Sequence, residues 1–306
     1  MPDFHRLTIW GARVAVTLSH AAAVLPGVRA DGTGRGGLVP AVLVAGSFAP
    51  DLTYHAAGLV PGAMGFGNVT HSLPGVLTAD VLLAWALVGL WLLLREPLVA
   101  LLPRSRRGRV AALVRCGAPR ARPRAALVAR WYGSAAPGAL THVVGDAFTH
   151  PGRWGTRAIP ALAGDVAGAP LYWWVQYGGS AVAAVVACAF LVRALRRVPA
   201  ARAEDGPADV PDLSVRDRVG AGVLLGGCAV AGAVWRAGRW REVWGAVAAP
   251  WELVPSLCFG AGAGLVPALL LYAGAVRARR PARRGERAET EGAETEGAEA
   301  EGVPVR

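Results

Sequence analysis

The sequence contains no lysine and few charged residues. Only 17% of its 306 residues are charged, whereas soluble domains carry about a quarter, spread over the surface. This scarcity excludes an ordinary soluble globular domain. The net charge of +11 comes entirely from arginine. Because the arginines lie in blocks beside apolar runs, as membrane orientation signals do, we expect no nucleic-acid partner.

Cysteine is also scarce. The four cysteines are Cys116, Cys188, Cys228 and Cys258, and no two of them have the spacing of a metal-ligand or redox motif. Three lie in apolar runs, where a small packed side chain is the usual interpretation. A thiolate metal centre is therefore not expected.

Apolar residues, by contrast, make up 54% of the chain and form long runs. A membrane-spanning helix needs about 20 apolar residues, and the candidate spans are Val76–Leu94, Ala125–Phe148, Gly178–Val192, Val219–Trp235 and Ser256–Val276. Leu38–Pro50 is too short to cross alone, and we expect it either to form a half-helix or to pair with the N-terminal segment. The sequence thus predicts an all-α, polytopic integral membrane helix bundle over residues 1–284.

The N-terminal apolar segment, Val14–Pro26, resembles a signal-peptide core in length. His20 interrupts it, and no convincing cleavage site of small residues follows. We therefore expect a retained, membrane-embedded helix.

The C-terminal residues 285–306 have a different composition. They repeat a Thr-Glu-Gly-Ala-Glu unit, include seven glutamates and contain almost nothing apolar. Such a segment cannot bury a core, so we expect a disordered acidic tail.

Three arginine blocks predict the topology. Residues 104–130 hold nine arginines, 193–218 hold six and 277–284 hold five. If all three are cytoplasmic, the Val76 run enters from outside and the Ala125 run leads outward. The end of the Ala125 run then lies near the outer leaflet of a multi-pass plasma-membrane protein.

Six polar residues stand out within this apolar chain. The sharpest motif lies in Thr141–His150, where His142, Asp146 and His150 recur at i, i+4 and i+8 and so share one helix face. His20, Asp51 and His71 interrupt apolar surroundings elsewhere. Ionisable residues in membranes are usually functional and partnered. Neutral imidazole together with carboxylate suits a divalent metal; zinc is favoured, with manganese or iron as alternatives.

Other polar residues have plainer interpretations. His5 and His55 are expected to be hydrogen-bonded packing residues, although His55 follows Asp51 by four positions. We interpret Asp80 as a residue that contacts a metal ligand without binding the metal itself. Arg153 suits either an anionic substrate group or a lipid headgroup.

Several short motifs together resemble the DUF4184 family of bacterial membrane proteins. They are Thr17–Pro26, Gly46–Asp51, Thr70–Gly75 with Asp80, Leu140–His150 with Gly152 and Trp154, and Gln176–Ser180. The resemblance covers roughly the first two thirds of the chain. Its motif layout is similar to that of membrane-bound metal-dependent hydrolases. This resemblance implies metal ligands at His20, Asp51, His71, His142, Asp146 and His150.

We therefore expect a metal-dependent hydrolase that acts on a lipid or lipid-linked phosphoester at the membrane interface. Asp51, His71 and Asp146 are the expected catalytic residues. An aspartate or an aspartate-bridged water must act as the base, because no glutamate lies near these motifs. The expected partners are membrane lipids and a small-molecule or lipid substrate, and the oligomeric state is not predicted. The alternative is a non-catalytic membrane protein with a structural metal or an ion-transporting cluster. Bis-histidine haem ligation is a third interpretation, which the aspartates disfavour.

Overall fold

The computed structural model describes residues 20–116, 124–199, 210–244 and 253–278. The acidic tail and most of the predicted N-terminal helix lie outside these residues, as does His5. Within them, four helices are long and apolar enough to cross a membrane: α7 (Ala79–Ala100), α11 (Leu171–Arg196), α13 (Val215–Trp244) and α14 (Val254–Ala278). The prediction of an all-α membrane bundle is confirmed.

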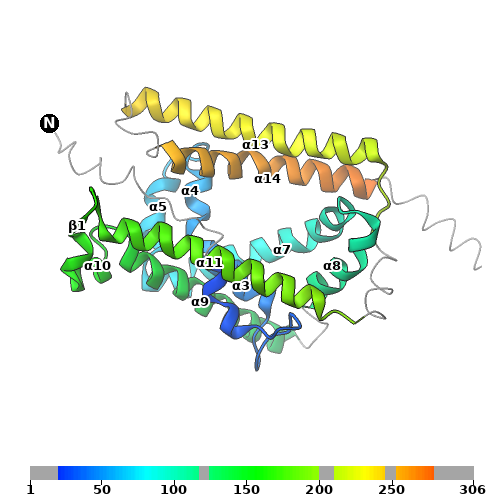
Figure 1. Cartoon of the computed structure of the whole chain (residues 1–306), viewed down its shortest axis with the longest axis horizontal. Coiled ribbons are helices and arrows are strands. Elements are labelled where there is room, and N and C mark those ends of the chain that lie inside the picture. Colours follow the sequence, from blue (N-terminus) through cyan, green and yellow to red (C-terminus); the bar gives the residue numbers. More distant parts are fainter. Residues whose placement is uncertain (1–19, 117–123, 200–209, 245–252, 279–306) are drawn as a thin grey trace, which may run out of the picture.

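The fifth predicted span forms helix α9 (Arg124–Thr149), which is not among those four. Its position nevertheless makes it part of the bundle. In Figure 1, α7 and α11 run towards the same end of the molecule, so the chain between them must return, and α9 is the helix that does so. Its 26 residues extend about 39 Å at about 1.5 Å per residue. Helix α9 therefore carries the chain back across the bundle.

Arginines collect at the end of the bundle where α7 and α14 finish. Helix α8 (Arg104–Cys116) follows α7 there. Glu96 lies 2.8 Å from Arg95, 3.6 Å from Arg115 and 4.0 Å from Arg277. Nearby, Asp212 pairs with Arg104 and Arg107. We call this the arginine end. The grouping agrees with the predicted topology, in which the arginine blocks share one side.

Short elements lie between and beside these long helices. They are α2 (His20–Ala23), η2 (Leu25–Gly27), α3 (Pro40–Phe48), η3 (Ala49–Asp51), α4 (Leu52–Ala56), α5 (Ala63–Thr70), α6 (Leu73–Leu77), α10 (Trp154–Ala158) and η4 (Pro160–Ala163). A two-stranded antiparallel hairpin, β1 (Asp165–Val166) and β2 (Ala169–Pro170), precedes α11. The run Leu38–Pro50 forms α3 and part of η3, which agrees with the prediction of a half-helix.

Glycine lets α3 and α9 approach closely. A Cβ on Gly46 would overlap the carbonyl of Ala135, and one on Gly138 would overlap the carbonyl of Leu43. Small residues allow this kind of close packing between membrane helices. Next to this contact, Val42 and Ala49 pack with Val81, Ala84 and Val88 of α7 in the main core. The close approach brings the end of α3, and η3 after it, beside the second half of α9.

Helices α13 and α14 form an antiparallel pair (Figure 1), and α14 packs against the end of α7. Gly232 of α13 faces Gly260 and Gly264 of α14 so closely that none of the three has room for a Cβ. Arg236 connects the pair to the rest of the bundle, because its guanidinium donates to the carbonyl of Tyr54 over 2.7 Å. The contact reaches α4, the helix that follows Asp51 directly.

Candidate metal centre

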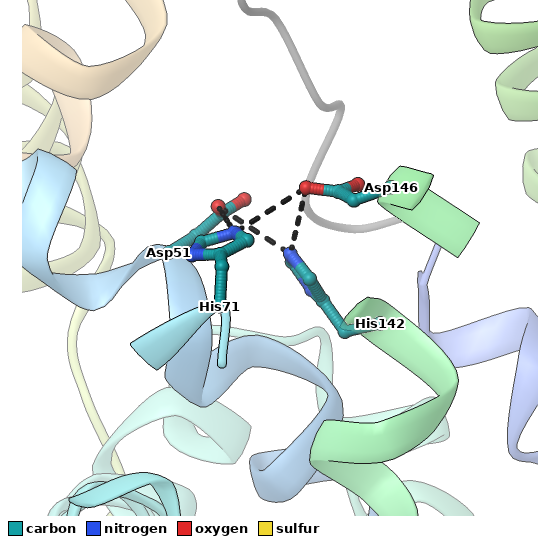
Figure 2. A group of neighbouring side chains, drawn as sticks. All are labelled: Asp51, His71, His142 and Asp146. Atoms are coloured by element: carbon teal, nitrogen blue, oxygen red, sulfur yellow. Dashed lines mark ion pairs between the residues drawn. The ribbon is translucent and has the colours of Figure 1, made fainter. Parts of the chain in front are cut away.

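Four side chains converge inside the bundle, as Figure 2 shows. Asp51 Oδ1 lies 3.4 Å from His142 Nε2 and 3.6 Å from His71 Nε2. Asp146 Oδ2 lies 3.3 Å from His71 Nε2 and 3.5 Å from His142 Nε2. Each carboxylate therefore contacts both imidazoles. One ligand atom from each of the four residues can be chosen so that all lie within 4.8 Å of one another.

Different elements bring these residues to one place. Asp51 ends η3, and His71 caps the C-terminus of α5, where the helix stops before Ser72 and Pro74. His142 and Asp146 stand one turn apart on α9, so their side chains lie on the same helix face. Three chain segments thus supply four side chains. The site can form only when α3, α5 and α9 are packed together.

Backbone carbonyls orient both imidazoles. His71 Nδ1 lies 2.9 Å from the carbonyl of Gly67, and His142 Nδ1 lies 2.8 Å from the carbonyl of Ser47. A ring nitrogen beside a carbonyl oxygen carries the proton, so the neutral ring presents Nε2 as its free lone pair. Histidine ligands of metals are usually held in this way. Both Nε2 atoms face the carboxylates.

The two remaining predicted histidines contact the other oxygen of Asp146. His20 Nε2 and His150 Nδ1 each lie 3.6 Å from Asp146 Oδ1. The ring of His20 also stacks on that of His142, with centroids 3.8 Å apart. The structure therefore brings together all six residues that the sequence singled out. Their roles as ligands or catalytic groups stay a prediction.

The central four residues have the properties of a cation site. All are buried, with exposed fractions of 7% or less. His142 Nε2 and Asp146 Oδ1 are enclosed and have no hydrogen-bond partner among the described residues. Enclosed polar atoms without partners are costly, and a bound cation would satisfy them. Two imidazole nitrogens with carboxylate oxygens are a donor set that divalent transition metals accept. The group can hold a metal ion, and the donor set does not distinguish zinc from manganese or iron.

Two of the ligand candidates, Asp51 and His71, lie on short segments between the long helices. Burial by itself would raise the pKa of the Asp51 carboxyl, but the charge of His142 and the close contacts of the carboxylate with His142 and His71 hold that pKa below its usual range. Burial would lower the pKa of His71, yet hydrogen bonds to Asp146 and Asp51 raise it. Metal binding requires these imidazoles to be neutral and the carboxylates to be ionised, so it would be coupled to the release of any protons that they carry.

The other polar predictions have mixed outcomes. The ring of His55 lies edge-on to Phe259 with centroids 4.9 Å apart, as a packing residue would. Asp80 is fully buried, but neither carboxylate oxygen has a hydrogen-bond partner among the described residues. It therefore does not support a ligand by a hydrogen bond, and the carbonyls of Gly67 and Ser47 do so instead. Sequence reasoning missed these carbonyls because a backbone atom leaves no residue-specific signal.

A cavity of about 310 Å³ adjoins the cluster and was not predicted. It lies between α2, α9 and α11, and Asp146 and His20 line it on the side of the cluster. Its other lining residues are Gly145, Phe148, Thr149, Val175, Gln176, Gly179 and Ser180. The only sequence signal was the Gln176–Ser180 motif, whose position beside α9 could not be known in advance. Arg153 is not among the lining residues.

The apolar helices and the buried His/Asp cluster define a multi-pass membrane protein with a candidate metal centre. The chain belongs to the DUF4184 family, described as a domain of unknown function, whose model matches residues 15–273. The match extends beyond the first two thirds of the chain and includes α13 and most of α14. No curated protein and no solved structure matches the chain.

Proposed function

We propose that this protein is an integral-membrane, metal-dependent hydrolase that cleaves a lipid or lipid-linked phosphoester at the membrane interface. The observation that carries the proposal is the cavity that reaches Asp146 and His20 beside the buried cluster. A purely structural metal site is closed, whereas a catalytic one keeps an open position for water or substrate. Asp146 and His20 belong to both the cluster and the cavity wall, so a substrate in the cavity meets the site directly.

The roles of the residues follow from their contacts. Asp51, His71, His142 and Asp146 would hold the metal, and His20 and His150 would position the carboxylate of Asp146. A divalent metal supplies Lewis acidity and eases the deprotonation of water. An aspartate oxygen accepts the proton of the attacking water. Water adds to phosphorus, the bond from phosphorus to the leaving alcohol breaks, and the alcohol takes up a proton.

The arginine end suggests the orientation. Arginine-rich segments next to spanning helices favour the cytoplasmic side, and Glu96 with its arginines lies at the far end of α7 from the cluster. The cluster then lies towards the outer face of the plasma membrane. That depth is where a lipid headgroup would be presented to the cavity.

A hydrolysis screen tests the proposal. Purified protein, supplied with Zn²⁺, Mn²⁺ or Fe²⁺, is incubated with phosphoester, ester and amide substrates, and products are measured by mass spectrometry. We expect metal-dependent phosphoester cleavage that Asp51→Asn abolishes. Glu96→Gln is the matched control, because it also neutralises a carboxylate within the bundle but lies at the arginine end. Metal-replete protein with no turnover on any panel would overturn the proposal and favour a non-catalytic metal site.

A further inference from the structure

The cavity beside the cluster has one wall formed by a membrane-crossing helix. Gln176 and Ser180 stand one turn apart on α11 and both line the cavity. Gln176 is buried, with 5% of its surface exposed. The amide of Gln176 offers two N–H donors and a carbonyl acceptor. Because Gln176 lines the same cavity as Asp146, its amide can hydrogen-bond to a polar group that enters the cavity.

The rim of the same wall is open to lipid. Val175 and Gly179 also line the cavity, yet Val175 is 40% exposed and Gly179 is exposed too. On a spanning helix, exposed apolar residues face the hydrocarbon. A volume of about 310 Å³ is at the small end of ligand pockets, which start at roughly 300 Å³. It can hold a headgroup, while acyl chains remain in the surrounding lipid.

The charges at the site limit the negative charge that a bound headgroup can carry. Asp51 and Asp146 together balance one divalent cation, and the described lining residues include no arginine. A headgroup with two negative charges would bring twice as much uncompensated charge into this buried place as a singly charged one, and uncompensated buried charge is costly. A phosphodiester carries one negative charge, and its remaining oxygens can accept hydrogen bonds from an amide or a hydroxyl.

We propose that the cavity between α2, α9 and α11 binds the headgroup of a lipid phosphodiester. In this arrangement Gln176 and Ser180 position the phosphate oxygens opposite Asp146. The inference rests on the proposed function and narrows its substrate class. Gln176 and Ser180 act as positioning residues that select the substrate, with no part in proton transfer.

Two adjacent glycines provide a matched test. A Cβ at Gly179 or at Gly178 would meet no atom within 4 Å, and both residues are exposed, but only Gly179 lines the cavity. Gly179→Leu should therefore fill the cavity, and Gly178→Leu should add the same side chain outside it. The probes are vesicles with phosphatidylglycerol, a phosphodiester, or phosphatidic acid, a phosphomonoester, each carrying a photoreactive group at the glycerol end of an acyl chain, next to the headgroup, and the crosslinked residues are mapped. Crosslinking and product release are measured in parallel.

We expect phosphatidylglycerol to crosslink to wild-type protein and to Gly178→Leu, and at least tenfold less to Gly179→Leu. Gln176→Leu should raise KM for phosphatidylglycerol more than it lowers kcat, with metal content unchanged. Equal crosslinking in the two glycine variants, or stronger labelling by phosphatidic acid, would overturn the inference. Turnover unaffected by Gly179→Leu would also overturn it but leave the hydrolase intact, whereas cavity labelling without any turnover would support the site and count against the hydrolase.

Discussion

The molecule has two groups of paired charges at opposite ends of α7, and they differ in kind. At the arginine end, Glu96 and Asp212 meet Arg95, Arg104, Arg107, Arg115 and Arg277. In the cluster, the ion-pair contacts of Asp51 and Asp146 seen among the described residues are with histidines. Arginine is always protonated and has no lone pair to offer a metal. Histidine can lose its proton and become a ligand.

Burial sharpens the difference. The side chains of Asp51 and His142 are 2% and 0% exposed, whereas those of Asp212 and Arg104 are 42% and 78% exposed. Exposed ion pairs contribute little and are screened by water. A buried charge that has lost its partner is strongly unfavourable. The comparison therefore predicts that the His/Asp cluster determines ligand binding. The ion pairs of the arginine end should contribute modestly to the stability of the fold and to its orientation in the membrane.

The largest expected effect is loss of metal from the cluster. Asp146→Ala removes the carboxylate that contacts His71, His142, His20 and His150. Metal affinity should fall by more than the ~10–100-fold typical of losing a supporting residue around a ligand. Elemental analysis of detergent-purified protein after metal supplementation measures this. Glu96→Gln should keep its metal, and equal metal content in the two variants would mean that the cluster is not the binding site.

The next prediction separates the two ends by membrane side. Gly65→Cys on α5 and Arg106→Cys on α8 place single exposed thiols at opposite ends of the molecule, in a background where the four native cysteines are serine. A membrane-impermeant maleimide should label position 65 in intact cells and position 106 only after permeabilisation. Labelling of both from the same side would contradict the orientation and the outer placement of the site.

A smaller effect is expected at the arginine end. Glu96→Gln leaves Arg95, Arg115 and Arg277 without their shared carboxylate. Because Glu96 is partly buried, the cost should lie between those of exposed and buried pairs, about 1–2 kcal/mol. Thermal unfolding in detergent should show a lower Tm with unchanged metal content. An unchanged Tm would mean that these pairs do not stabilise the fold.

The smallest effect concerns pH. Hydrogen bonds from Arg104 and Arg107 lower the pKa of Asp212 to about 2, from about 3.9 in an unfolded chain. A lowered folded-state pKa stabilises the protein above pH 3.9, and that contribution is lost as the pH falls towards 2. Asp212→Asn should therefore be slightly less stable than wild type at pH 7, and the difference should vanish near pH 2. A difference that persists there would indicate another cause.

Much of the fold was predictable because spanning helices have a strong local signal. The runs beginning at Val76, Gly178, Val219 and Ser256 form or overlap α7, α11, α13 and α14. Helix α8 was missed as a helix, because its arginines led to its interpretation as a charged block. The candidate span Ala125–Phe148 forms α9, which is less apolar than the other four, and the directions of α7 and α11 in Figure 1 show that α9 crosses back through the bundle.

For the site, the sequence by itself determined which residues have ligand chemistry, because ionisable groups are rare and costly in an apolar chain. It also placed His142 and Asp146 on one helix face through their i, i+4 spacing. Only the tertiary structure decided that Asp51 meets His142 and that Gln176 faces the same cavity as Asp146. These contacts join segments far apart in the chain. They depend on the close approach of α3 to α9, where Gly46 and Gly138 leave space, and no local pattern specifies which helices will pack together.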